Sequence, residues 1–251
     1  MRNVLRLPIA SLCGLLLLLA TPAWAAKIAV IGTGNVGSAL GPEFAALGHT
    51  IVYGSRTPME QDVKDLVAKT GHGAMAMSQQ DAVKGADIVV LAVPGNLAVD
   101  ITKSLGDLSG KIILDPTNVV NRGSADGYAD HGAPGTSNAE RIQAAAPNAK
   151  VVKAFNTLNW TKMVDPQSSG GPVSIPIVGN DAGARATVAA LVKGMGLEPV
   201  DLGPLRFANT LEEMLVIWAN ARSHGAAFNY YLRPEPPSAP APPSAPRIST
   251  N

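Results

Sequence analysis

The sequence predicts an α/β fold in which helices cover both faces of a doubly wound, mostly parallel sheet. Short apolar runs rich in β-branched residues alternate along the chain with amphipathic helical stretches, which is the pattern of a sheet buried on both sides. The first apolar run ends in a glycine-rich turn that opens a helix. Between residues 26 and 232 no change in composition marks a boundary, so a single domain is expected.

The expected strands are apolar runs, one of which is weak. The core runs are continuously apolar instead of alternating, as strands covered on both faces are. In chain order the runs are 27–31, 50–53, 74–77 (the weak one), 87–93, 111–114, 150–155, 173–178 and 197–202.

Helix boundary signals occupy the gaps between these runs. The segment Thr57-Pro-Met-Glu60 offers an N-cap, a proline at the first helical position and a capping-box glutamate, and Ser78 to Asp81 repeats the device more weakly. Glycine readily adopts the left-handed conformation found just beyond a helix C-terminus. The helices should therefore stop near Gly48, Gly71 and Gly85.

The two ends of the chain are expected to lie outside the domain. Arg2 and Arg6 precede a leucine-rich run and the triplet Ala23-Trp-Ala25, which is typical of a cleavable secretory signal over residues 1–25. This predicts a periplasmic or secreted protein with no stable membrane span after signal removal, whereas a misassigned start codon would leave the protein in the cytoplasm. Residues 233–251 are proline-rich, and a disordered tail is expected there.

Composition excludes several classes of function. The 20 Lys and Arg residues balance 19 Asp and Glu residues, and 4% of the residues are aromatic, so the chain lacks the basic field and the stacking surface of a nucleic-acid-binding protein. Cys13 is the only cysteine, which excludes an intramolecular disulfide and a cysteine-built metal site, and no metal is expected. The expected partner is a small-molecule substrate, and the sequence is compatible with a homodimer.

The strongest chemical signal is a G-x-G-x-x-G turn between the first strand and a helix, which is typical of an NAD(P)-binding Rossmann fold. Gly32 would make the tight turn, Gly34 would let the backbone approach a pyrophosphate, and Gly37 would let helix and strand pack closely. The helix N-terminus adds free N–H donors. The expected cofactor-binding residues of this turn are Gly32, Thr33, Gly34, Asn35, Val36 and Gly37.

The end of the second strand indicates which dinucleotide binds. An NAD site has an Asp or Glu there that accepts a hydrogen bond from the ribose 2′-OH, whereas this chain has Ser55 and Arg56. A hydroxyl and a guanidinium match a 2′-phosphate in charge and geometry. NADP is therefore the expected cofactor, and the competing interpretation is that Arg56 is an ordinary solvated loop residue.

Small residues follow three later strands, at the sheet edge where open α/β folds bind ligands. We expect Val93, Pro94 and Asn156 to contact the cofactor, and Pro94, Asn118 and Asn156 to lie at the acceptor site. Asp115, Asn118 and Asn156 could fix a nicotinamide carboxamide, a ribose or a substrate, or could merely cap turns.

Expectations for two ionisable residues and for the last helix concern the same ligand-binding edge of the sheet. Lys153 lies in an apolar strand, either buried with a partner or pointing to solvent, and is not expected to be catalytic. His131 lies in the long connection 116–136, where a solvated loop histidine is favoured over a proton donor. The last helix is expected to wall the acceptor site, and its apolar residues are interpreted as core packing: Phe207, Met214, Trp218 and Phe228.

On these motifs the run from Lys27 to Pro234 resembles the coenzyme F420-dependent NADP oxidoreductase family, which shares its nucleotide-binding part with pyrroline-5-carboxylate reductase. The elements that carry the resemblance are the glycine turn, Gly54-Ser-Arg56, Val93-Pro94, Asp115-Pro-Thr-Asn118, Val152-Lys-Ala-Phe-Asn-Thr157 and Asp201-Leu-Gly-Pro-Leu205. The set also resembles the nucleotide-binding domain of six-transmembrane metalloreductases. The resemblance implies that Ser55 and Arg56 hold the 2′-phosphate and that the strand-end loops hold the nicotinamide.

The function implied is that of an NADP-dependent oxidoreductase, a reductase that transfers a hydride between NADPH and a deazaflavin, flavin or similar small acceptor. Two alternatives stay open: an exported NADP-binding or redox-sensing module without turnover, and a reductase of a small imine or carbonyl substrate. About 75 residues follow Thr157 before the proline-rich tail. This length disfavours the helical domain that completes the imine site in pyrroline-5-carboxylate reductases.

Overall fold

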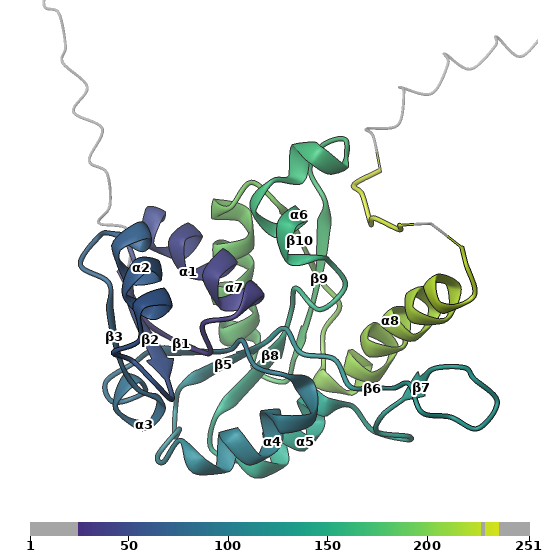
Figure 1. Cartoon of the computed structure of the whole chain (residues 1–251), viewed down its shortest axis with the longest axis horizontal. Helices are drawn as coiled ribbons and strands as arrows, with labels where there is room; N and C mark the ends of the chain where they lie inside the picture. The colour runs from purple at the N-terminus through teal and green to yellow at the C-terminus, as the bar shows by residue number, and fades with distance from the viewer. Residues whose placement is uncertain (1–24, 227–228, 236–251) are drawn as a thin grey trace, which may run out of the picture.

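The computed structural model describes residues 25–226 and 229–235. The expected secretory signal, apart from its last residue, therefore lies outside the described residues, as do Phe228 and most of the proline-rich tail. Figure 1 shows a central sheet with helices on both faces and one helix, α8 (Ala208–Ser223), that extends from the body beside a small hairpin. Within the described ranges, the structure contains no helix with the length and apolar character needed to cross a membrane.

The central sheet has eight strands in the order β10-β9-β8-β5-β4-β1-β2-β3. Neighbouring strands pair in parallel except β8 and β9, which are antiparallel. The bounds are β1 Lys27–Ile31, β2 Thr50–Ser55, β3 Met75–Ser78, β4 Ile88–Leu91, β5 Ile112–Asp115, β8 Lys150–Lys153, β9 Ser174–Gly179 and β10 Glu198–Asp201. Each expected strand is present, the weak one included, and the predicted mostly parallel α/β fold is confirmed.

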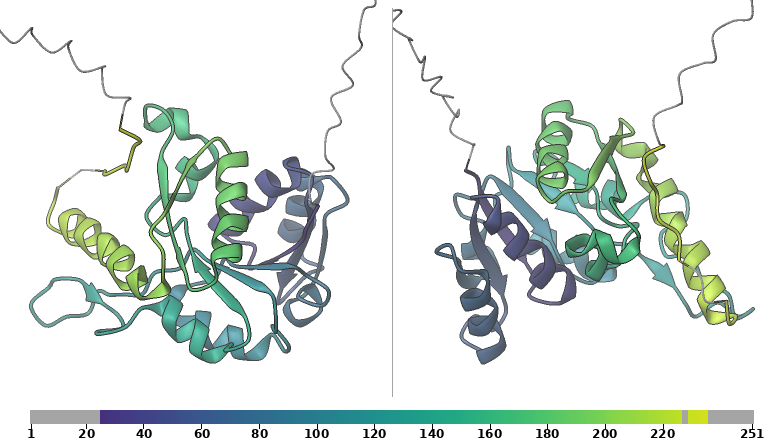
Figure 2. Two further views of the ribbon diagram at one scale, coloured as in Figure 1. Left: turned by 180° about the vertical axis from the view of Figure 1, so that it is seen from behind. Right: turned by 90° about the horizontal axis from the view of Figure 1, so that it is seen from above.

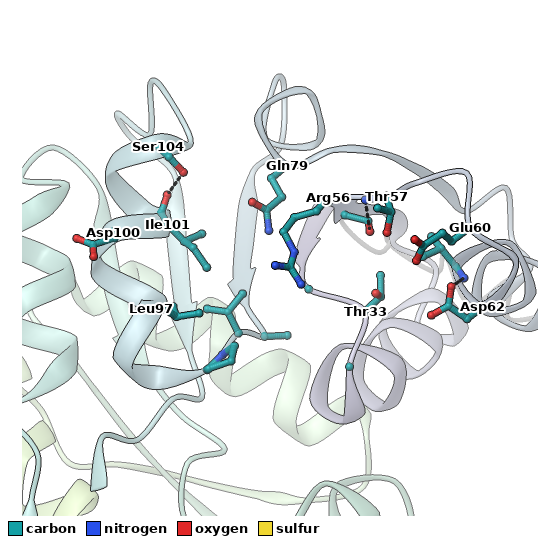
Figure 3. Close-up of a pocket in the computed structure, with 18 residues that line it drawn as sticks. Thr33, Arg56, Thr57, Glu60, Asp62, Gln79, Leu97, Asp100, Ile101 and Ser104 are labelled. Atoms are coloured by element: carbon teal, nitrogen blue, oxygen red, sulfur yellow. Dashed lines mark hydrogen bonds between the residues drawn. The ribbon is translucent and has the colours of Figure 1, made fainter. Parts of the chain in front are cut away.

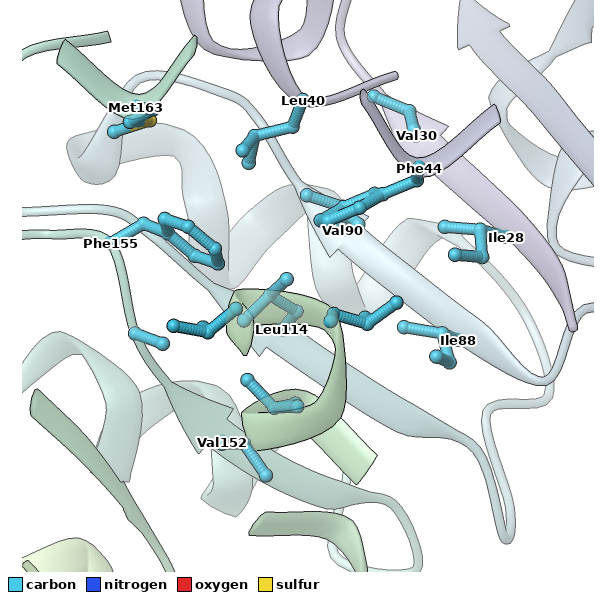
Figure 4. Close-up of a cluster of buried hydrophobic side chains, with 14 of the residues drawn as sticks. Ile28, Val30, Leu40, Phe44, Ile88, Val90, Leu114, Val152, Phe155 and Met163 are labelled. Atoms are coloured by element: carbon cyan, nitrogen blue, oxygen red, sulfur yellow. The ribbon is translucent and has the colours of Figure 1, made fainter. Parts of the chain in front are cut away.

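Two apolar layers bury the faces of the sheet. One layer packs α1, α2, α6 and α7 against the sheet around side chains such as Leu40, Phe44 and Val188, part of which Figure 4 shows. The other packs α3, α4, α5 and the start of α8 around Ala98, Ile142 and similar residues. The helix bounds are α1 Asn35–Ala46, α2 Gln61–Thr70, α3 Gln79–Ala82, α4 Gly95–Ser104, α5 Asn138–Ala145, α6 Trp160–Val164 and α7 Ala182–Gly194, with 3₁₀ turns η1 Pro166–Ser169 and η2 Leu205–Phe207.

Local end signals predicted some helix boundaries and missed one. Ser78 caps α3 as expected, because its hydroxyl accepts from the Asp81 N–H at 3.1 Å. The predicted start of α2 at Thr57 is wrong: the helix begins at Gln61, and Glu60 is its N-cap without a side-chain hydrogen bond. The Thr57 N–H instead donates to Ser55 Oγ at 3.1 Å, which holds residues 57–60 in a turn at the end of β2.

A hairpin of two short strands, β6 (Val120–Asn121) and β7 (Asp130–His131), was not expected from the sequence. Its loop packs on α8, where the Asn220 side chain exchanges two hydrogen bonds with the backbone of Ala129, at 2.6 and 2.8 Å. In Figure 2 the hairpin and the far end of α8 project together from the body. Two-residue strands are too short to show a periodic pattern in the sequence, so only the tertiary structure reveals this hairpin.

Candidate active site

A cavity of about 580 Å³ opens at the carboxyl ends of β1, β2 and β4. Its lining includes seven of the residues that were expected to bind a cofactor: Gly32, Thr33, Gly34, Ser55, Arg56, Val93 and Pro94. Figure 3 shows the Arg56 side chain pointing into this cavity, with Glu60 and Asp62 at the far side. We call it the glycine cavity.

The three glycines of the G-x-G-x-x-G turn differ in whether the fold itself requires a glycine at that position. A Cβ on Gly32 would lie 2.3 Å from the Ala92 carbonyl oxygen, and one on Gly37 would lie 2.1 Å from the Gly32 carbonyl oxygen, so the fold itself requires both glycines. Gly34 has an ordinary φ of −76°, and no heavy atom lies within 4 Å of the position that its Cβ would take. The fold itself therefore does not require a glycine at position 34, and Gly34 lines the glycine cavity.

The end of β2 has the chemistry of an anion site. Ser55 is the last residue of the strand and is buried, while Arg56 is exposed to the cavity. Ser55 Oγ accepts from the Thr57 N–H, which leaves its own proton to donate. Nothing acidic occupies the first turn of α1, so its N–H groups face the cavity with their partial positive charge uncompensated from that turn.

A second cavity of about 270 Å³ lies beside the first, and we call it the aromatic cavity. Its polar lining includes Asn118 and Asn156, and its apolar lining includes Val36, Phe155 and Trp218. Helix α8 therefore forms part of its wall through Leu215 and Trp218.

The two cavities share no lining residue, but they come close to each other at the start of α4. A Cβ on Gly95 would lie 2.0 Å from the Asn118 carbonyl oxygen, so the α4 turn that borders the glycine cavity touches the wall of the aromatic cavity. Gly34 and Val36 likewise put the first turn of α1 in contact with both cavities.

Asn156 is held rigidly in the aromatic cavity. Its Nδ2 donates to Asn118 Oδ1 and to the Leu211 carbonyl oxygen, each at 2.9 Å, and Asn118 Nδ2 donates back to the Asn156 carbonyl at 2.8 Å. Because a backbone carbonyl can only accept, these bonds fix both amide orientations. They leave Asn156 Oδ1, which is buried, without a hydrogen-bond partner among the described residues.

The backbone before Asn156 is strained. Phe155 has a φ of +66°, a left-handed conformation that a bulky side chain rarely adopts. Such conformations cost about 1–3 kcal/mol and are concentrated at functional sites. Here the strain turns the chain at the end of β8 so that both Phe155 and Asn156 line the cavity.

Of the three acceptor-site candidates, Asn118 and Asn156 line the aromatic cavity, whereas Pro94 does not. Pro94 lines the glycine cavity and is the N-cap residue of α4. The interpretation of the last helix is also corrected in part, because Phe207 is exposed and Trp218 lines the aromatic cavity instead of filling the core.

A buried ionic cluster joins the elements that carry the aromatic cavity. Lys153 Nζ, at the end of β8, lies 2.7 Å from Asp115 Oδ2, 2.7 Å from the Thr117 carbonyl oxygen and 2.9 Å from Glu212 Oε1 of α8. Lys153, Asp115 and Glu212 are all fully buried. The cluster therefore pins α8 against the sheet one turn before Leu215, which lines the cavity.

Two further groups complete this cluster. The Asn138 N–H, at the start of α5, donates to both Glu212 oxygens at 3.0 Å. His131 Nδ1 accepts from the Ala133 N–H at 3.2 Å, so its Nε2 carries the proton that it donates to Glu212 Oε2 at 2.8 Å. The favoured interpretation of His131 as a solvated loop residue is therefore wrong.

The cluster is structural in its chemistry. Burial alone would lower the pKa of Lys153, but the adjacent Asp115 and Glu212 carboxylates outweigh that effect and hold the pKa above its ordinary value of 10.5. Lys153 is thus a permanent cation at neutral pH. Asp115, paired with it, is not available to a nicotinamide or a substrate, which corrects its place among the candidate ligand-binding residues.

Sequence reasoning missed Glu212 entirely. It lies in the middle of α8, where a glutamate is usually solvated, and its partners come from positions 74 and 81 residues away along the chain. Within residues 25–226 and 229–235, no three His, Cys, Asp or Glu side chains are arranged to hold a metal ion.

Residues 27–119 match the family described as NADP oxidoreductase, coenzyme F420-dependent. A solved structure from Arthrobacter sp. FB24, described as an F420-dependent NADP reductase, is 34% identical with a TM-score of 0.72, and the match covers 81% of this chain and 96% of that one. The F420-dependent NADP reductase of Methanothermobacter thermautotrophicus is 26% identical over 220 residues, which are 82% of this chain and 94% of the relative. The family match contains every residue that lines the glycine cavity.

A metalloreductase is also similar. STEAP3 of Rattus norvegicus is 27% identical over 192 residues, which are 76% of this chain but 36% of the metalloreductase. The chain thus spans about a third of the length of the metalloreductases that it matches.

Proposed function

This chain belongs to the coenzyme F420-dependent NADP oxidoreductase family, and we propose that it is a reductase in which hydride passes between NADPH and a flavin-like ring held in the aromatic cavity. The observation that carries the proposal is that two unlike cavities lie close to each other at the carboxyl ends of parallel strands. A dinucleotide laid across the first turn of α1 would reach from Arg56 in one cavity to Asn156 in the other.

The glycine cavity suits the phosphate-bearing half of NADP. Arg56 would pair with the 2′-phosphate, and Ser55 would donate its hydroxyl to it. The open space at Gly34 would admit the pyrophosphate to the N–H groups of α1. No acid of β2 competes for the 2′ position, since that strand ends in Ser55.

The aromatic cavity suits the reacting half. NADPH supplies the hydride when bound, and the task of the protein is to hold two rings in contact and to exclude water, which needs little acid–base chemistry. Asn156 Oδ1 is oriented to accept an N–H from a carboxamide or from a ring. The Tyr230 hydroxyl donates to the Met214 carbonyl at 2.9 Å, and burial raises its pKa, so this part of the wall stays neutral.

The assignment of NADP is tested by Arg56→Ala. Loss of a charge-assisted contact costs roughly 1.5–3 kcal/mol, so NADPH should bind about tenfold or more weakly while NADH affinity hardly changes. Arg141→Ala, which removes an exposed arginine on α5, is the control and should leave both affinities unchanged. Equal losses for NADPH and NADH in calorimetric titrations would show that Arg56 does not read the 2′-phosphate.

Turnover separates a reductase from a binding module. We expect the absorbance of NADPH to fall only when an acceptor such as F420, riboflavin or FMN is added. Tight NADPH binding with no oxidation in the presence of any of these acceptors would favour the binding module instead.

A further inference from the structure

The glycine cavity carries more negative than positive charge. One cation, Arg56, lines it together with three carboxylates, those of Glu60, Asp62 and Asp100, which leaves the lining with a net charge of −2. Figure 3 shows Arg56 on one side of the cavity and Glu60 and Asp62 on the other. The 2′-phosphate of NADPH adds about −1.5 to −2 at pH 7, so the carboxylates of this lining oppose the cofactor that Arg56 attracts.

Two of the three carboxylates have partners of their own. Asp62 Oδ1 accepts from the Val63 N–H at 2.8 Å, and Asp100 lies 3.8 Å from Lys103 Nζ. Within the described part of the chain, the Glu60 side chain forms no hydrogen bond and no ion pair. The N-terminus of α2 contributes only about half a positive charge beside it. Glu60 is therefore the carboxylate whose charge is least compensated before a ligand binds.

A tight turn holds Glu60 near the end of β2. The Thr57 N–H donates to Ser55 Oγ at 3.1 Å, and the Glu60 N–H donates to the Thr57 carbonyl oxygen at 3.1 Å. A hydrogen bond between residues three apart closes a turn whose first and fourth Cα atoms lie within about 7 Å of each other. Rossmann folds bind the adenosine ribose at the end of this strand. The turn thus keeps the Glu60 carboxylate on the same side of the sheet as the position of the 2′ group.

We propose that Glu60 opposes Arg56 in cofactor selection, so that this chain binds NADH and NADPH with dissociation constants within about tenfold of each other. The inference rests on the proposed function, because it concerns the cofactor of the same reductase. Arg56 attracts the 2′-phosphate and the Glu60 carboxylate repels it, whereas the 2′-hydroxyl of NADH is neutral and experiences neither effect.

The two effects are of similar size. A charge-assisted contact to the 2′-phosphate favours NADPH by about tenfold or more. Repulsion between a carboxylate and a phosphate about 10 Å apart in water removes roughly three- to tenfold at low salt. Glu60 therefore cancels much of the preference that Arg56 creates.

The first test measures binding without turnover. NADPH and NADH are titrated into the full-length wild type and into Glu60→Gln, which removes the charge and keeps the shape of the side chain. We expect the Kd for NADPH to fall roughly three- to tenfold while the Kd for NADH hardly changes. Glu60 is exposed and makes no capping hydrogen bond, so the melting temperature should stay near wild type.

Two control variants separate charge from shape and from position. Glu60→Asp changes the shape but keeps the charge, so its ratio of NADPH to NADH affinity should stay close to that of the wild type. Glu198→Gln makes the same chemical change at an exposed glutamate of β10, at the opposite end of the sheet, and should leave both affinities unchanged.

The salt dependence tests the mechanism. The Debye length is about 30 Å at 0.01 M salt and about 3 Å at 1 M. The difference between wild type and Glu60→Gln in the ratio of NADPH to NADH affinity should therefore be largest at low salt and should nearly vanish at high salt. A difference that persists unchanged at high salt would show that Glu60 does not act by repulsion, and would overturn the inference.

The remaining outcomes separate this inference from the proposed function. If Arg56→Ala weakens NADPH alone but Glu60→Gln leaves the affinity ratio unchanged, the site of the 2′-phosphate stands and the role of Glu60 fails. If Glu60→Gln shifts the ratio as expected but no acceptor is reduced, the role of Glu60 stands and the reductase activity fails. A wild-type preference for NADPH of more than about tenfold also overturns the inference.

Discussion

Replacing Lys153 by methionine should cause a large loss of stability. Its Nζ lies 2.7 Å from Asp115 Oδ2 and 2.9 Å from Glu212 Oε1, and all three side chains are fully buried. Methionine is flexible and unbranched and fills a similar space, so the main change is the loss of a charge between two buried carboxylates. Removing one partner of a buried ion pair costs about 3–5 kcal/mol, chiefly because the other charge is left uncompensated.

The loss is measured by urea denaturation at pH 7. With a slope of about 3 kcal/mol per M, the midpoint of the variant should fall by roughly 1–1.7 M. Lys150→Met on the same strand is the control, because Lys150 forms an exposed ion pair with Asp181 at 3.2 Å. Exposed pairs contribute about 0–1 kcal/mol, so this midpoint should hardly move.

The pH dependence follows from the raised pKa of Lys153. A cation whose pKa lies above its ordinary value of 10.5 in the folded state stabilises the fold fully below that pH and loses its contribution only as pH rises through the higher value. The difference in unfolding free energy between wild type and Lys153→Met should therefore stay constant between about pH 7 and pH 9, below the ordinary pKa of lysine. A loss under about 1 kcal/mol at pH 7 would refute the view that Lys153 compensates the charge of the two buried carboxylates.

Two further predictions concern the site. Gly34→Val should leave the melting temperature within a few degrees of wild type, because its Cβ meets nothing within 4 Å, but should weaken NADPH and NADH alike by blocking the pyrophosphate; Gly37→Ala is the contrast and should unfold at a lower temperature, since its Cβ would meet the Gly32 carbonyl oxygen at 2.1 Å. Unchanged NADPH affinity in Gly34→Val would contradict the placement of the cofactor. Asn156→Ala should lower turnover more than NADPH affinity, because it removes a positioning group at the reacting end. Steady-state kinetics beside NADPH titration measures both, and full turnover with each acceptor that wild type reduces would show that Asn156 is not part of the acceptor site.

The sequence by itself determined the sheet and one end of the site, because their signals are local. A continuously apolar strand, a helix that stops at glycine, and a G-x-G-x-x-G turn each need only neighbouring residues, and the strands and the glycine cavity lie where these patterns placed them. The predicted helix start at Thr57 was wrong although its pattern is also local. The Thr57 N–H donates to Ser55 Oγ, and the helix begins at Gln61 instead.

Only the tertiary structure decided the chemistry around the aromatic cavity. Glu212 and Asp115 are ordinary carboxylates in the sequence, and they become a buried pair around Lys153 only when α8 packs against β5 and β8. The aromatic cavity arises in the same way. Phe155 and Trp218 are 63 residues apart in the sequence and line the same cavity only after folding. Contacts between distant segments leave no periodic trace along a chain, because they depend on how strand order and helix packing bring those segments together in space.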